Sequence, residues 1–549
     1  MKKSFLRIFA LIFVIVFASC SNSFIEEDPS EEAMGRDYDS SINSTIPVAI
    51  EEEASVGPEA VVTGDSAAFQ TVTSDFSSNI QNGAVDVPVN EPVSITFTIS
   101  IDSASVNNQT LYLTDENNQR LYSRATVSGN TITLIPQIRL QPRSTYNVTA
   151  AGIKDVYGRT IETVSINYTN TDLDYGLYWY GYYGRCEKYI PGVENAFYNP
   201  SAQSVIYAHG WQAGAVAQTD GYGREGYGYE IFHWAEDNFD GSEQYNGLRK
   251  WTNTAWLDDG WNTGMVYWNQ FADEPTTSGG NLTGVHAAEA KIWSFHGPNG
   301  SRYAYLNDNN DIAYRYWDRH VNFNGQDVVV ESAGELLGLY VTHALQYNTS
   351  GNIRFVGHSL GNQMATVLAW ECYQQGIGID RISLLDPAWS AYSKSYLPND
   401  GYGTWTGERA RNYLMEMDAA VEIYHTTGMN LGAPVMDDNV PLTEWACDVN
   451  QSPWYYDADN LSGKHIAPRH TYFWSYESAP PVECTIGWWN RRNPTGEDGP
   501  SASASTARIR EMMGTEYEWT QVEGRYTSDP SDDWFERKEK ESGWLGSLW

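Results

Sequence analysis

The sequence predicts a small antiparallel β-sandwich followed by a larger α/β domain with a mostly parallel sheet. The first observation is the alternation of apolar and polar residues within 79–173. The second is the succession of short apolar strands and longer mixed segments within 174–484. The third is the length of 549 residues, which exceeds what one hydrophobic core ordinarily holds. We therefore expect at least two folded domains.

The sandwich is predicted from strands of period two. Within 93–99, Val, Ile, Phe and Ile alternate with Ser and Thr, and the alternation returns at 111–113, 132–134 and 146–148. Short strands at about ten-residue spacing are typical of a small sandwich. Segments such as Ser94-Ile95-Thr96-Phe97 and Leu134-Ile135-Pro136 resemble bacterial Ig-like domains. Such a module more often serves as a spacer than as a binding site.

The α/β domain is predicted from its buried strands. A helix is expected over 327–345 and another over 362–374. No structure is predicted for residues 485–549, which contain a Ser/Ala run and a charged, Trp-ended segment. The expected strands are Val205–Ala208, Met265–Trp268, Ile353–Val356, Ile382–Leu385 and Val421–Tyr424.

The N-terminus predicts export and membrane anchoring. Residues 1–19 form a signal peptide with a basic start and an apolar run too short to span a bilayer, and Phe17-Ala18-Ser19-Cys20 resembles a bacterial lipobox. Cleavage before Cys20 and its lipidation would anchor the chain stably, on the bacterial cell membrane or outer membrane. An ordinary secretory signal is the alternative. Residues 20–78, acidic and poor in aromatic residues, are expected to form a disordered tether.

Charge and cysteine content restrict the partners. The formal net charge is −36, from 70 acidic and 34 basic residues, which argues against nucleic acid because phosphates would be repelled. If Cys20 is lipidated, four of the five cysteines remain, and an oxidising compartment would allow one or two disulfides. No C-x-x-C pair or His/Cys cluster indicates a metal site.

The main candidate for chemistry is Ser359, in the run Gly357-His358-Ser359-Leu360-Gly361. The run lies between the strand expected at 353–356 and the helix expected at 362–374, which is the strand–turn–helix of the nucleophile elbow in an α/β-hydrolase fold. The two flanking glycines allow the strand and helix backbones to approach closely. This context predicts Ser359 as a nucleophile; a structural serine in a turn is the alternative.

A serine nucleophile needs a base, an acid and oxyanion donors. Asp386 ends the strand at 382–385 and is the predicted acid, because acid and base follow the serine in this fold. His465 and His470 are the downstream candidates for the base, and His470 is preferred because it opens an apolar run. The oxyanion donors are predicted to be the backbone N–H groups of Leu360 and of Trp211, in the loop after the strand at 205–208.

These motifs together resemble the pancreatic-lipase family of neutral lipases and phospholipases A1. The resemblance covers about residues 180–484 and implies Ser359 as nucleophile, Asp386 as acid and His470 as base. It also implies an ester or lipid substrate and no cofactor. The motifs that carry it are His209-Gly210-Trp211, Gly357-His358-Ser359-Leu360-Gly361, Asp386-Pro387-Ala388 and Val421-Glu422-Ile423-Tyr424-His425-Thr426.

The chain departs from that family in two places. In the family, two cysteines close a lid loop; here Cys447 begins a comparable loop, and Cys484 beyond His470 is the candidate partner. The loop carries Trp454-Tyr455-Tyr456, which would cover the site. The sequence shows no counterpart of the family's C-terminal sandwich, so smaller esters and polymer esters remain candidate substrates. Met415 replaces an acidic residue of the family's calcium site, so no metal is predicted.

The function expected from the sequence is that of a serine carboxylic-ester hydrolase, a lipase or esterase, acting on extracytoplasmic esters or lipids. Phospholipase A1 activity is one alternative. A non-catalytic, lipase-like surface binding protein is another, and an adhesin that works through residues 79–173 is a third. The expected partners are the substrate and, through Cys20, a membrane. The sequence predicts no oligomeric state.

Overall fold

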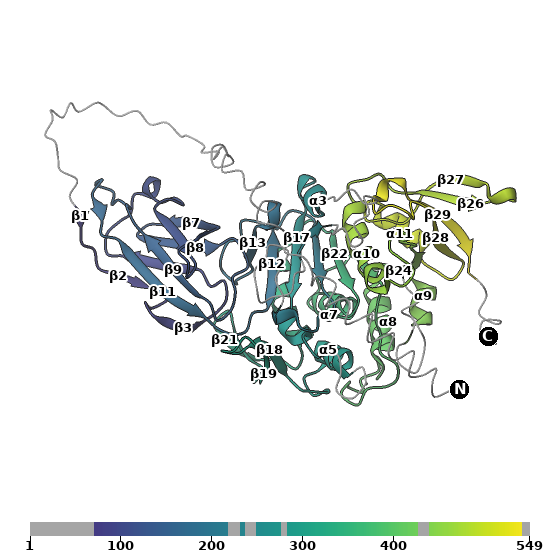
Figure 1. Cartoon of the computed structure of the whole chain (residues 1–549), viewed down its shortest axis with the longest axis horizontal. Coiled ribbons are helices and arrows are strands. Elements are labelled where there is room, and N and C mark those ends of the chain that lie inside the picture. The colour runs from purple at the N-terminus through teal and green to yellow at the C-terminus, as the bar shows by residue number, and fades with distance from the viewer. Residues whose placement is uncertain are drawn as a thin grey trace, which may run out of the picture.

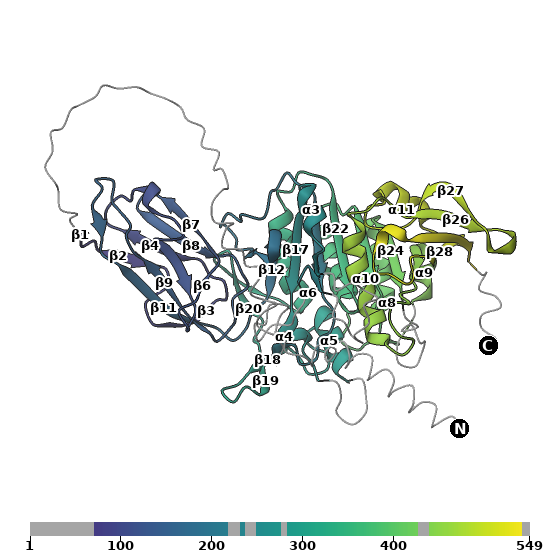
Figure 2. The ribbon, with the colours of Figure 1, turned by 45° about the horizontal axis from the view of Figure 1, so that its top comes forward.

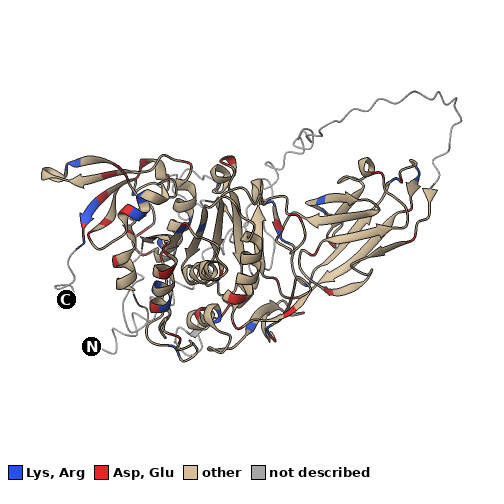
Figure 3. Ribbon diagram, turned by 180° about the vertical axis from the view of Figure 1, so that it is seen from behind, with Lys and Arg blue, Asp and Glu red and all other residues tan. Residues whose placement is uncertain are grey.

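The computed structural model describes residues 71–217, 231–235, 249–275, 283–426, 437 and 439–540. The predicted signal peptide, Cys20 and most of the predicted tether lie outside these residues. A β-sandwich and a larger α/β domain lie side by side along the long axis (Figure 1). Acidic and basic residues are interspersed over both domains (Figure 3). Within the described ranges, no helix is long and apolar enough to cross a membrane.

The N-terminal domain is the predicted sandwich. Its five-stranded sheet has the order β3-β11-β9-β5-β6 and its four-stranded sheet the order β2-β4-β8-β7. The inward residues Ile95, Leu113 and Val148 are completely buried, which confirms the predicted alternation. A short pair, β1 (Thr71–Val72) and β10 (Thr160–Ile161), lies beside the sheets. The sheet strands are β2 (Phe76–Ser78), β3 (Ala84–Val87), β4 (Val93–Phe97), β5 (Leu111–Thr114), β6 (Arg120–Leu121), β7 (Ser123–Ser128), β8 (Thr131–Pro136), β9 (Thr145–Ala150) and β11 (Val164–Asn170).

The second domain is built on a twelve-stranded sheet of order β13-β12-β17-β14-β22-β23-β24-β25-β28-β29-β26-β27. Neighbours from β17 to β28 are parallel, and antiparallel strands lie at both edges. The predicted mostly parallel sheet is therefore confirmed. The strands are β12 (Gly176–Tyr180), β13 (Cys186–Lys188), β14 (Ser204–Ala208), β17 (Asn262–Tyr267), β22 (Ile353–His358), β23 (Arg381–Leu385), β24 (Ala420–His425), β25 (Cys447–Asn450), β26 (Val482–Ile486), β27 (Arg492–Asp498), β28 (Tyr517–Glu523) and β29 (Trp534–Glu539).

Helices cover both faces of this sheet (Figure 2). Side chains of α5, α6, α7 and α8 share one hydrophobic core with the sheet, and side chains of α3, α10 and α11 share the other. Adjacent strand residues such as Phe355 and Val356 therefore enter opposite cores, which explains the continuous apolar strands of the sequence. The helices named here are α3 (Thr254–Asp258), α5 (Thr283–Trp293), α6 (Ala333–Leu345), α7 (Gly361–Gln374), α8 (Thr406–Met417), α10 (Leu461–Ser475) and α11 (Thr506–Met512).

The helix expected over 327–345 begins later than predicted, at Ala333. Residues 320–329 form a hairpin of β20 (His320–Phe323) and β21 (Gln326–Val329) instead. Ser332 then begins α6, because its hydroxyl accepts a hydrogen bond from the Glu335 N–H at 2.9 Å.

The C-terminal residues, for which the sequence predicted no structure, complete the α/β domain. Strands β26 to β29 belong to its sheet, so the expected boundary at residue 484 falls inside β26. The Ser/Ala run 501–505 is largely buried and accepts hydrogen bonds from two strand arginines. Arg354 Nη1 donates to Ala502 O at 2.8 Å, and Arg381 Nη1 donates to Ala504 O at 2.6 Å.

The Cys447–Cys484 disulfide suggested by the family resemblance is not present. Both residues are buried and lie outside any disulfide, as does Cys372. Cys447 opens β25 and Cys484 lies in β26, and β28 and β29 separate these strands in the sheet. Three strand spacings amount to about 14 Å, whereas a disulfide requires Cα atoms within about 7 Å.

Candidate active site

Ser359 lies in a tight turn between β22 and α7. Its φ of +57° is the left-handed conformation that a non-glycine residue seldom adopts. Close backbone packing requires glycine on both sides of the turn. A Cβ on Gly357 would lie 2.5 Å from Asn362 Cα, and one on Gly361 would lie 2.7 Å from His209 C. The Ser359 N–H donates to Leu385 O at 3.1 Å and fixes the turn against β23. The predicted strand–turn–helix is therefore present.

Asp386 lies at the carboxyl end of β23, next to β22 in the sheet. It is buried, with φ of +42°, and its N–H donates to Tyr424 O at 2.7 Å. The carboxylate Oδ1 accepts the Thr426 N–H at 3.1 Å, and Oδ2 lies 2.6 Å from His465 Nδ1. The predicted acid is thus held by the backbone of β24 and directed at an imidazole.

That imidazole belongs to His465, and the expectation that Asp386 pairs with His470 is wrong. Both histidines lie in α10, but His470 Nε2 contacts the Arg469 guanidinium instead. His465 is completely buried and also contacts the residue before the nucleophile. Its carbonyl accepts a hydrogen bond from His358 Nε2 at 2.7 Å, and the two rings lie 4.6 Å apart.

The Asp386 contact determines which nitrogen of His465 carries the hydrogen. An ionised carboxylate only accepts hydrogen bonds, so Nδ1 is the protonated nitrogen of the neutral ring. Nε2 is then the basic nitrogen, the form that a general base requires. The sequence identified His465 as one of two candidates for the base. Its pattern did not show which of the two side chains faces Asp386.

The loop after β14 lies against the nucleophile. A Cβ on Gly210 would lie 2.8 Å from Ser359 Cβ and 3.3 Å from Ser359 Oγ, so only glycine fits there. Trp211, the predicted donor, follows directly, and its buried indole Nε1 donates to Glu274 O at 3.0 Å. Leu360 caps α7, so its N–H lies at the positive end of the helix dipole. Leu360 therefore follows Ser359 in the chain, and Gly210, the residue before Trp211, lies against Ser359.

A second histidine–carboxylate contact lies one strand further along the sheet. His425 Nε2, at the end of β24, is 3.3 Å from Asp448 Oδ1 in β25. Burial opposes protonation of His425, but the hydrogen bond and charge of Asp448, with the charge of Asp386, raise its pKa overall. From the sequence, His425 was named only as part of the motif 421–426.

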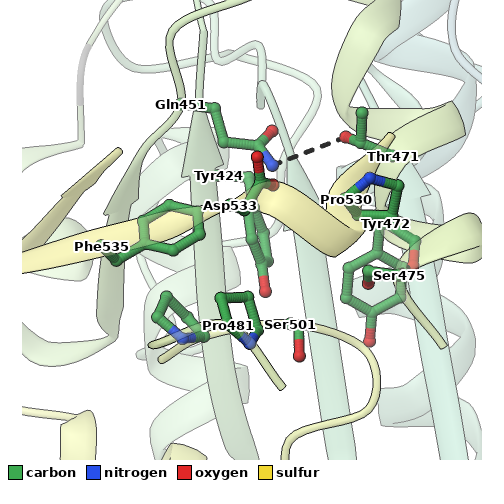
Figure 4. A pocket seen from close by; sticks show the side chains of 11 residues that line it. Tyr424, Gln451, Thr471, Tyr472, Ser475, Pro481, Ser501, Pro530, Asp533 and Phe535 are labelled. Carbon is green, nitrogen blue, oxygen red and sulfur yellow. Dashed lines mark hydrogen bonds between the residues drawn. The ribbon is translucent and has the colours of Figure 1, made fainter. Parts of the chain in front are cut away.

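A small cavity of about 10 Å³ lies between α10 and the C-terminal residues (Figure 4). Gln451 Nε2 donates to Thr471 Oγ1 at 3.5 Å at its rim. The cavity has room for about one water molecule, and Ser359, Asp386 and His465 do not line it. It marks the packing of the C-terminal residues on α10 rather than a substrate site.

The fold is thus an α/β domain preceded by a β-sandwich, and its sheet edge carries Ser359 and the Asp386–His465 pair. Residues 65–170 match the family of bacterial Ig-like domains, which indicates a cell-surface or extracytoplasmic protein. No curated protein matches the chain.

Three similar solved structures each match a fifth of the chain or less. The N-terminal part of the bacterial S-layer protein SbsC is 22% identical over 20% of this chain and 26% of that chain, with a TM-score of 0.16. This chain therefore spans about a quarter of the SbsC structure. CopC from Methylosinus trichosporium OB3b is 13% identical over 18% of this chain and 93% of its own, with a TM-score of 0.16. LD transpeptidase LdtMt1 in complex with imipenem is 19% identical over 18% and 40%, with a TM-score of 0.14.

Proposed function

We propose that this protein is a serine carboxylic-ester hydrolase that works through an acyl-serine intermediate. The observation that carries the proposal is the 2.6 Å contact between Asp386 and His465, next to Ser359 on its strained turn. A buried serine, aspartate and histidine, in this order along the chain, are the groups that acyl transfer on this fold requires. The resemblance to the pancreatic-lipase family supports the same assignment, with His465 in place of His470 as the base.

The proposed reaction begins when Ser359 Oγ attacks the ester carbonyl carbon. His465 Nε2 takes the hydroxyl proton, and the carbonyl oxygen becomes an oxyanion that the N–H groups of Trp211 and Leu360 stabilise. The C–O bond to the alcohol then breaks, and His465 returns the proton to the leaving alcohol. Water, deprotonated by His465, attacks the acyl carbon; the bond to Ser359 Oγ breaks, His465 returns the proton to Oγ, and the carboxylic acid is released. Asp386 keeps the imidazole oriented and stabilises its cation.

The proposed setting is extracytoplasmic. The Ig-like domain supports that location. Anchoring by a lipidated Cys20 would hold the enzyme at a membrane, within reach of lipid or polymer esters. In the segment 453–460 before α10, Tyr455 is buried and Trp454 is half exposed, and this segment is the proposed cover of the site. An ester series from acetyl to oleoyl, together with a phospholipid, would define the acyl length and the leaving group.

Turnover of p-nitrophenyl acyl esters by single variants tests the proposal. Ser359→Ala and His465→Ala should abolish turnover, while His470→Ala should keep it, with unfolding midpoints showing that each variant is folded. A fluorophosphonate probe should label the wild-type protein at Ser359. Full activity of folded Ser359→Ala would refute the proposal, and a wild-type protein that neither reacts with the probe nor hydrolyses any ester would be a binding protein.

A further inference from the structure

The loop that carries the proposed oxyanion donor is hydrogen-bonded to the neighbouring loop from His209 to Val216. The two loops follow β14 and β17, which are adjacent parallel strands. All the groups involved are buried or nearly so. The contacts are Trp268 Nε1 to His209 O at 2.8 Å, Asn269 Nδ2 to Gln212 Oε1 at 2.8 Å, Trp211 Nε1 to Glu274 O at 3.0 Å, and Gly214 N and Val216 N to Asp273 at 2.6 and 3.0 Å.

One residue of the Ig-like domain reaches into this pair of loops. Arg139 lies between β8 and β9 of the sandwich and is buried. Its Nη2 donates to Asn269 Oδ1 at 3.2 Å, and its guanidinium lies 3.7 Å from the ring centre of Tyr267. Its Nε donates to Asp174 Oδ2 at 3.2 Å. The sandwich thus contacts the second loop through a charged, desolvated side chain.

Asn269 connects Arg139 to the oxyanion loop. It is completely buried; its carbonyl oxygen accepts from Arg139 while its amide nitrogen donates to Gln212. The two bonds fix the amide in one orientation, because rotation by 180° would place NH₂ against the guanidinium and oxygen against oxygen. Gln212 follows Trp211 in the chain. A loss of Arg139 would leave a buried acceptor unsatisfied and release the side chain that holds this loop.

We propose that the Ig-like domain is a working part of the active site rather than a spacer: Arg139 is a positioning residue that holds the oxyanion loop through Asn269 and Gln212. The catalytic part of this inference rests on the proposed function. The coupling between Arg139 and the oxyanion loop is a property of the fold, and it can be measured without substrate.

The test compares Arg139→Met with Arg124→Met in the full chain. Arg124 also joins the two domains, donating to Glu187 at 2.8 and 2.9 Å, but it contacts no described residue of either loop of the site. Arg139→Met leaves Asp174 paired with Lys188 at 2.7 Å, so no buried charge is stranded. Loss of a hydrogen bond from a charged donor predicts about 10- to 100-fold faster hydrogen exchange at the Gly214 and Val216 amides in Arg139→Met. Arg124→Met should leave this exchange unchanged.

The kinetic expectation follows from the same geometry. Arg139→Met should lower kcat for the p-nitrophenyl ester by about 10-fold or more with KM little changed, because the oxyanion forms only in the transition state. Arg139→Lys should recover part of the loss, and in Asn269→Ala the Arg139→Met change should have no further effect. Equal exchange and equal kcat in the two arginine variants would overturn the inference. If the wild-type protein lacks esterase activity, the proposed function fails and hydrogen exchange alone decides the coupling.

Discussion

Gly210→Ala tests whether the loop after β14 forms half of the site. The added Cβ would lie 2.8 Å from Ser359 Cβ and 2.9 Å from His358 O. Ordinary carbon–carbon contact is about 3.5–4.0 Å, so the loop and the nucleophile must separate by about 1 Å. Because a misplacement of that size can cost about 100-fold in rate, we expect kcat/KM for p-nitrophenyl esters to fall about 100-fold, or about 2.7 kcal/mol.

The matched control is Gly378→Ala, in a loop beyond α7. A Cβ on Gly378 meets no atom within 4 Å, and its φ is not in the left-handed region, so activity and unfolding midpoint should stay at wild-type values. The rate of fluorophosphonate labelling should fall in Gly210→Ala in parallel with ester turnover. A folded Gly210→Ala protein with wild-type labelling and turnover would refute the placement of this loop at the nucleophile.

Three further predictions follow from individual side chains. Asp386→Asn should lower kcat about 10⁴-fold with the fold intact, measured with p-nitrophenyl esters; a loss of less than tenfold would contradict the Asp386–His465 pairing. Burial, together with the Glu335 carboxylate, raises the pKa of Glu371 to about 7, so the native state keeps a proton there and loses stability as pH rises from about 4.5 to 7. Glu371→Gln should therefore raise the free energy of unfolding at pH 8 by about 3 kcal/mol and hardly change it at pH 4, as measured by denaturant unfolding, whereas equal gains at both pH values would refute this cause. Cys372, Cys447 and Cys484 lie outside any disulfide, so dithiothreitol should leave the unfolding midpoint unchanged, and a lower midpoint would reveal a disulfide.

The parts of the fold that the sequence predicts are those set by local pattern. Strands of alternating residues formed the sandwich, and short apolar runs formed the central parallel strands, because each pattern matches one kind of burial. The nucleophile turn was predictable because Gly357 and Gly361 mark the close approach of strand and helix. The C-terminal strands were not predictable, since residues 492–498 and 534–539 are polar strands near a sheet edge. Only long-range pairing with the rest of the sheet defines them.

The choice between His465 and His470 shows why chain order alone identifies the site incompletely. Both residues follow Asp386 and both lie in α10, so order and element type do not separate them. Five residues of an α-helix correspond to a rotation of about 140°, which points the two side chains in different directions. One face of α10 meets Asp386 and His358, and the buried contacts of His465 place it on that face. A prediction of the base from sequence would therefore need the rotation of α10 about its axis, which is fixed by the packing of Tyr472 and Phe473 in the second core.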